Sequence, residues 1–123
     1  MSEINHLATS IGLTNSRNGF HDRFISLTAE GDAEGMREHV LVKLGLITSE
    51  IAEAMEEIRS GRGIAERYYG ENGKPEGVPV EIVDAIIRAF DLLYLIGVTD
   101  PEELIREKLE FNTARAKMHG KTI

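Results

Sequence analysis

The chain has 123 residues, of which 41% are hydrophobic and 28% are charged, proportions typical of one globular domain. Its formal net charge of −7 opposes attraction to a phosphate backbone, so we expect no nucleic-acid partner. The absence of cysteine excludes disulfides and thiolate metal sites and fits a cytoplasmic location. No apolar run is as long as a membrane span, and the first residues do not resemble a signal peptide, so we expect neither insertion nor export.

The first third of the chain carries one clear and one ambiguous helical signal. Apolar residues recur at helical spacing between Ser2 and Leu13 and predict a helix there. Residues 14–35 mix turn formers with a short apolar cluster, which fits a loop, a short helix, or both.

Two longer helices are predicted in the middle of the chain. Asp32 is a suitable N-cap for a helix from about Ala33 to Arg59. A second helix is predicted from about Val80 to Ile96, with apolar residues on most of its circumference, as in a buried helix. The glycine-rich segment from Gly61 to Pro79 between them predicts a long loop that could act as a lid.

A last helix is predicted to begin at Pro101 and to fade near Lys117. Thr99 or Asp100 would cap it, and its first-turn acids suit the positive end of the helix dipole. The remaining tail is basic, and we expect it to be flexible.

Carboxylates form a stripe on each of the two central helices. Glu50 and Glu53 are one turn apart beside an apolar stripe, a pattern that, alone, is typical of a solvated helix face. Glu81 and Asp84 repeat the spacing, and Asp91 follows on the same face, too far along the helix for the dipole to explain. The second stripe therefore favours a functional interpretation.

Buried carboxylates need compensation, because an unpaired buried charge costs several kcal/mol. If the two helices pack side by side, their two acidic pairs meet around one cavity, where a divalent cation would offset their repulsion. Oxygen ligands favour Mg²⁺, or Mn²⁺, over zinc. We therefore predict one metal site made by Glu50, Glu53, Glu81 and Asp84.

These motifs resemble a known signature. The run Glu50-Ile-Ala-Glu53, followed after 27 residues by Glu81-Ile-Val-Asp84, resembles the EExxE…ExxD signature of the MazG-like, all-alpha nucleoside triphosphate pyrophosphohydrolases. Ser49 stands where the signature has its first Glu. The resemblance extends over roughly residues 36–121.

The resemblance implies metal-dependent hydrolysis of a nucleoside triphosphate to its monophosphate and pyrophosphate, with Glu50, Glu53, Glu81 and Asp84 as catalytic metal ligands. Further residues are candidates for contacts with the substrate. They are Arg88, Asp91, Lys108, Asn112, Arg115, Lys117, His119 and Lys121.

Each of these candidates also has a simpler interpretation. Arg88 could pair with Asp84 and Asp91 rather than reach a phosphate. The basic residues of the last helix could serve solubility, and His119 could be an exposed bystander.

The expected architecture is one all-α domain over residues 1–123, with an N-terminal extension of about 1–32 and a catalytic core of about 33–121. We expect a bundle of about four helices completed by dimerisation, as a homodimer or a dimer of dimers, because a thin bundle would leave its apolar surface wet. Rival functions are a non-enzymatic binding or scaffold module, and a related hydrolase dedicated to phosphoribosyl-ATP, dUTP or dCTP. A di-iron protein is disfavoured, since no Glu-x-x-His pair occurs on these helices.

Overall fold

The computed structural model describes residues 2–119, with side chains described as far as residue 115. Helices dominate this part of the chain, which confirms the all-α prediction. The five helices are α1 (Glu3–Arg17), α2 (Asp22–Glu30), α3 (Ala33–Arg59), α4 (Val78–Leu95) and α5 (Pro101–His119). Between α3 and α4 lie two short antiparallel strands, β1 (Tyr68–Tyr69) and β2 (Pro75–Glu76), joined by a 3₁₀ turn over Glu71–Gly73.

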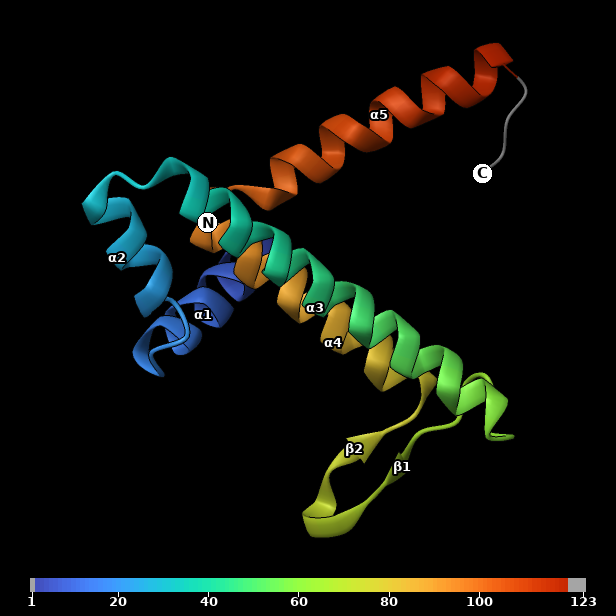
Figure 1. The fold of residues 1–123 in the computed structure, drawn as a ribbon. Helices are drawn as coiled ribbons and strands as arrows, with labels where there is room; N and C mark the ends of the chain where they lie inside the picture. Colours follow the sequence, from blue (N-terminus) through green and yellow to red (C-terminus); the bar gives the residue numbers. More distant parts are fainter. Residues whose placement is uncertain (1, 120–123) are drawn as a thin grey trace.

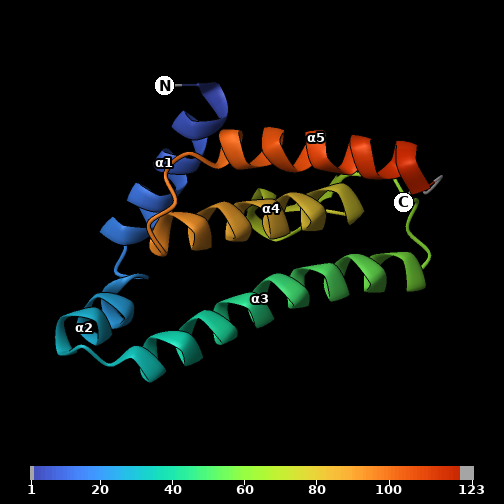
Figure 2. The same ribbon diagram turned by 90° about the horizontal axis from the view of Figure 1, so that it is seen from above.

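Helices α3 and α4 lie side by side along most of the length of α4 and form the centre of the fold (Figure 1). Helix α1 packs against α4, and α2 packs against the first half of α3 (Figures 1 and 2). Helix α5 packs chiefly on α1 and then runs away from α3. The α3–α4 pair therefore provides the surface on which a site can form.

The segment that the sequence left ambiguous is largely helical. Helix α1 continues four residues past its predicted end, to Arg17, and α2 follows after a short turn. Phe24 and Leu27 are buried one turn apart on α2, and Gly31 ends the helix in the left-handed conformation that glycine favours. With α2, the described residues hold five helices rather than about four.

The central helices agree closely with their predicted bounds. The Asp32 side chain caps α3 by accepting a hydrogen bond from the Gly35 amide at 2.9 Å. Helix α4 begins two residues earlier than predicted, at Val78, because Pro79 is tolerated in the first turn, where helical amides have no intrahelical partner. An N-terminal amide of α5, that of Glu102, donates to Asn5 Oδ1 of α1 at 2.9 Å, a tertiary contact that the sequence did not predict.

The glycine-rich segment folds back as the β1–β2 hairpin and is tied to the end of α3. The Tyr68 hydroxyl contacts both carboxylate oxygens of Glu57 at 2.9 Å, and the Arg62 guanidinium lies 3.7 Å from the centre of the Tyr68 ring. Gly77 joins the hairpin to α4 with φ at 122°, and a Cβ there would lie 2.3 Å from the Glu66 carbonyl oxygen. Only glycine fits this junction.

Helix α4 is less buried than its apolar composition predicted. Ile82, Val83 and Ile86 are 46%, 49% and 48% exposed, because neither α3 nor α1 covers this flank. Large apolar side chains are also exposed along α3; they include Leu41, Leu44, Ile51, Met55 and Ile58. In the described part of the chain, no helix combines the length and apolar character that crossing a bilayer requires.

The crossing of α1 and α4 depends on Gly12, which is buried and faces Tyr94. A Cβ at residue 12 would lie 2.2 Å from the Tyr94 ring. We expect Gly12→Ala to lower the free energy of unfolding by roughly 1–3 kcal/mol, since the two helices must separate or the ring must leave its rotamer. Urea denaturation followed by circular dichroism measures this loss.

Gly45→Ala is the matched control, because residue 45 is also helical but a Cβ there would meet nothing within 4 Å. We expect it to raise stability by roughly 0.5–1 kcal/mol, as alanine is the better helix former. Equal stability of the two variants would contradict a close packing of α1 on α4.

Candidate metal centre

Three glutamates from two helices meet where α3 packs on α4. Glu50 and Glu53 lie one turn apart on α3, and Glu81 lies in the first turn of α4. One carboxylate oxygen from each lies within 4.8 Å of the others. Glu50 and Glu81 are buried, whereas Glu53 is exposed. The structure thus brings together three of the four predicted ligands as a glutamate cluster with one open side.

The surroundings of the glutamate cluster shift the pKa values of Glu81 and Glu50 in opposite directions. Burial, together with the neighbouring Glu53 and Glu50, raises the pKa of Glu81 to about 7. Its Oε2 atom is buried and has no hydrogen-bond partner among the described residues. The hydrogen bond from Arg88, opposed by burial, lowers the pKa of Glu50. Near neutral pH, Glu50 is therefore ionised while Glu81 is only partly so.

The fourth predicted ligand, Asp84, borders the glutamate cluster without joining its closest group. It is half-buried one turn after Glu81, and burial followed by the charge of Glu50 raises its pKa. Its carboxylate is not among the three whose oxygens lie within 4.8 Å of one another.

Arg88 has a different partner from those that the sequence suggested. Its Nε atom donates to Glu50 Oε1 at 2.8 Å, across the helix pair, rather than to Asp84 or Asp91 on its own helix. Asp91 is bonded to His21 instead, and Glu50 offers a buried carboxylate, where a charged hydrogen bond gains strength away from water. One guanidinium thus offsets part of the charge of the glutamate cluster.

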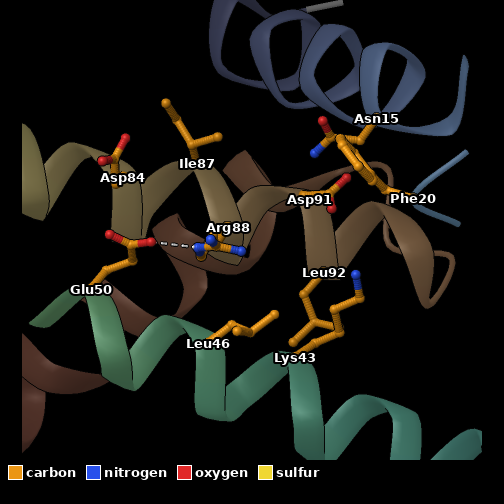
Figure 3. Close-up of a pocket in the computed structure, with 10 residues that line it drawn as sticks. All are labelled: Asn15, Phe20, Lys43, Leu46, Glu50, Asp84, Ile87, Arg88, Asp91 and Leu92. Carbon is orange, nitrogen blue, oxygen red and sulfur yellow. Dashed lines mark hydrogen bonds and ion pairs between the residues drawn. The ribbon is translucent and has the colours of Figure 1, made fainter. Parts of the chain in front are cut away.

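A cavity of about 490 Å³ extends from the glutamate cluster along α4. Figure 3 shows Glu50 and Asp84 at one end, Arg88 near the middle, and Asn15, Phe20 and Asp91 at the other end. Its lining residues are Asn15, Phe20, Lys43, Leu46, Glu50, Asp84, Ile87, Arg88, Asp91 and Leu92. The volume is within the range of cavities that hold small organic ligands.

Asp91 lines this cavity and is held by a hydrogen bond with His21 that the sequence did not predict. Its Oδ1 atom lies 2.8 Å from Nε2 of His21, and both residues are buried. The His21 ring stacks on Tyr94, with ring centres 6.1 Å apart. The pair fixes the start of α2 against α4.

Six residues that line the cavity were not among the predicted site residues, and three of these, Asn15, Phe20 and Lys43, are polar or aromatic. Lys43 lies two turns before Glu50 on the same face of α3, so helical periodicity could have identified it. Asn15 and Phe20, at the end of α1 and in the following turn, had no local signal, because only tertiary packing brings them to α4.

The predicted basic substrate contacts on the last helix lie apart from this cavity. Lys108, Asn112 and Arg115 are exposed on α5, which runs away from α3 (Figure 1), and none of them lines the cavity. Lys108 lies instead over the Phe111 ring at 5.0 Å. The side chains of Lys117 and His119, and the whole of Lys121, fall outside the described residues.

The chemistry of the glutamate cluster fits a hard divalent cation. It offers oxygen ligands alone, and the partnerless Glu81 oxygen is an atom that a cation would satisfy. No protein-family model, curated protein or solved structure matches the chain. The geometry of the site and the carboxylate motif are the features of the chain that bear on its function.

The raised pKa of Glu81 predicts how Mg²⁺ affects stability at different pH. Between about 4.5 and 7 the folded protein binds more protons at Glu81 than the unfolded chain, so without metal its contribution to stability falls as pH rises through this window. The raised pKa of Asp84 likewise makes the protein less stable as pH rises. The lowered pKa of Glu50 has the opposite effect on stability, but only at pH values below this window. Because Mg²⁺ competes with the proton, we expect it to raise Tm more at pH 8 than at pH 5.

Thermal unfolding followed by circular dichroism, with and without Mg²⁺, measures this difference. Glu81→Gln is the informative control, since it removes one of the two groups whose pKa is raised and should reduce both the pH dependence and the Mg²⁺ effect. An Mg²⁺ effect of the same size at pH 5 and pH 8 would contradict proton competition at this site.

Proposed function

We propose that the chain is a metal-dependent nucleoside triphosphate pyrophosphohydrolase, which cleaves its substrate to the nucleoside monophosphate and pyrophosphate, with a role in cleaning the nucleotide pool. The observation that carries this proposal is the convergence of three glutamates within 4.8 Å at one end of a cavity of about 490 Å³. The likeness of the two carboxylate motifs to the MazG-like signature supports it.

The charge balance supports a substrate that arrives together with metal. Glu50, Glu53, Glu81 and Asp84 would hold Mg²⁺ or Mn²⁺, and Arg88 balances only part of their charge. When bound, such a cation supplies Lewis-acid stabilisation for the phosphate oxygens and makes the attacking water more acidic. A triphosphate brings further negative charge, so a metal complex of the nucleotide matches this site better than a free nucleotide does.

The residues of the cavity then have defined tasks. Arg88 lies near the middle of the cavity, beside its acidic end (Figure 3), and its positive charge can bind and orient the phosphate chain. Glu53 is the exposed member of the glutamate cluster and is the carboxylate that an incoming water meets first. Water adds to one phosphorus and the bridging oxygen leaves with the other, so that hydrolysis between the α and β phosphates releases pyrophosphate.

A second copy of the chain is part of the proposal. Many large apolar side chains on α3 and α4 are exposed to water, and their burial against another chain would be favourable. A homodimer or a dimer of dimers would cover this flank, in keeping with a helical enzyme of the cytoplasm. Light scattering after size-exclusion chromatography measures the oligomeric state.

A non-enzymatic scaffold is the second candidate, and the same exposed apolar flank favours it. The two candidates differ at the glutamate cluster. A hydrolase takes up Mg²⁺ or Mn²⁺ and releases pyrophosphate, whereas a scaffold does neither. Calorimetric titration with each metal, followed by a pyrophosphate-release screen over common and modified triphosphates that includes dUTP, dCTP and phosphoribosyl-ATP, separates them.

Two substitutions test the assigned ligands. We expect Glu53→Gln and Asp84→Asn each to abolish turnover while the helical circular dichroism signal stays intact, because they remove metal ligands that are not part of the apolar core. Steady-state pyrophosphate release and metal titration measure the two losses.

Glu56→Gln is the matched control, because Glu56 is exposed on α3 and pairs only with Arg59 among the described residues. This variant should keep the turnover of the unsubstituted protein. Full activity in Glu53→Gln or Asp84→Asn would remove that residue from the site, and full activity in both would overturn the proposed function.

A further inference from the structure

The cavity has two chemically different ends, and the proposed function uses only one of them. Glu50 and Asp84 mark the acidic end, while Asn15, Phe20 and Asp91 gather at the distal end (Figure 3). The distal end combines an aromatic ring, a side-chain amide, a buried carboxylate and the amine of Lys43 (Figure 3). These are the groups with which proteins hold a flat, polar heterocycle.

The distance between the two ends suits one nucleotide. Asp84 and Asp91 are two helical turns apart on the same side of α4, which places them about 10 Å apart along the helix axis. Arg88 lies between them on the cavity wall. A nucleotide whose phosphates meet Asp84 and Arg88 would therefore place its base beside Asp91.

Asp91 is held as a hydrogen-bond acceptor at the distal end. His21 engages its Oδ1 atom at 2.8 Å and is itself 3% exposed, so the carboxylate has a fixed orientation. The structure gives Asp91 no second side-chain partner among residues 2–115, which leaves Oδ2 able to accept from a ligand in the cavity. A buried acceptor favours a ligand group that donates a hydrogen bond and disfavours one that offers only another acceptor.

Phe20 and Asn15 complete the recognition surface. The Phe20 side chain is 58% exposed and lines the cavity, so its ring is accessible to a ligand there. Its ring can stack on a base regardless of the identity of that base. The Asn15 amide offers both a donor and an acceptor to the neighbouring ring atoms.

We propose that the distal end selects nucleotides whose base carries an exocyclic amino group, as in cytosine and adenine, over the corresponding keto bases. Asp91 accepts a hydrogen bond from the amino group, Asn15 bonds the adjacent ring nitrogen or carbonyl, and Phe20 stacks on the ring. Asp with the cytosine amine and Asn with adenine are pairings known from base recognition. This inference rests on the proposed function for the placement of the phosphates.

Binding of nucleoside monophosphates tests the selection without any hydrolysis. Calorimetry in Mg²⁺ compares CMP with UMP and AMP with IMP, two pairs that each exchange an amino group for a keto group. We expect the amino member of at least one pair to bind about tenfold more tightly, the effect of one hydrogen bond to a charged acceptor. Equal affinities within both pairs, tighter binding of the keto members, or no binding at all would overturn the proposal.

Asp91→Asn tests the residue that makes the selection. The amide oxygen can still accept from His21, so the fold is retained, while the amide nitrogen turns toward the cavity as a donor. We expect the amino preference to vanish or reverse. Asp100→Asn is the matched control, since Asp100 is exposed and does not line the cavity, and it should keep the preference.

Phe20→Ala gives a measurement that does not depend on the packing of Asp91. The substitution should lower the affinity for both nucleotides of each pair by a similar factor and leave the ratio of the two affinities unchanged, because stacking does not depend on the amino group. A retained amino preference in Asp91→Asn, or a Phe20→Ala variant that binds as tightly as the unsubstituted protein, would count against the assignment.

The outcomes also separate this inference from the proposed function. Selective monophosphate binding without any triphosphate hydrolysis would reject the enzyme and keep the base site. Hydrolysis of amino and keto triphosphates at equal rates, with equal monophosphate binding, would keep the enzyme and reject the base site.

Discussion

Repulsion among Glu50, Glu53 and Glu81 is the constraint around which the central helix pair is arranged. Three carboxylate oxygens within 4.8 Å of one another are tolerated because Arg88 reaches across from α4 and because Glu81 gives up part of its charge. Both adjustments come from the packing of α4 on α3. The stability of that packing and the electrostatics of the site are therefore two aspects of one interface.

The structure also divides its polar and apolar surfaces along the same two helices. Glu50, Asp84 and Asp91 line a cavity that α1 and the turn before α2 help to close. The apolar residues Ile82 and Ile86, by contrast, remain open to water. Under the proposed function, this arrangement leaves one flank for substrate and another for a second copy of the chain.

Local signals account for what the sequence predicted well. The bounds of α3 follow from a capping aspartate and a continuous helical pattern, and the meeting of Glu50, Glu53 and Glu81 follows from their spacing once α3 and α4 pack together. The existence of α2 was left open because its burial depends on α3. The contact between His21 and Asp91 joins residues 70 positions apart, and no local pattern encodes it. No local pattern encodes the direction of α5 either. Asn5 of α1 fixes the start of this helix, and Lys108 therefore lies away from the cavity.

The position of Glu81 in the glutamate cluster depends on Gly77, which precedes the first turn of α4. Gly77 lies four positions before Glu81, and its carbonyl accepts a hydrogen bond from the Glu81 amide at 3.0 Å. The carbonyl of Glu66 occupies the space where any other residue would carry its Cβ. A larger residue there would force residue 77 and Glu66 apart, and Glu81, which the first turn of α4 carries, would shift relative to its two neighbours on α3 although no ligand had changed.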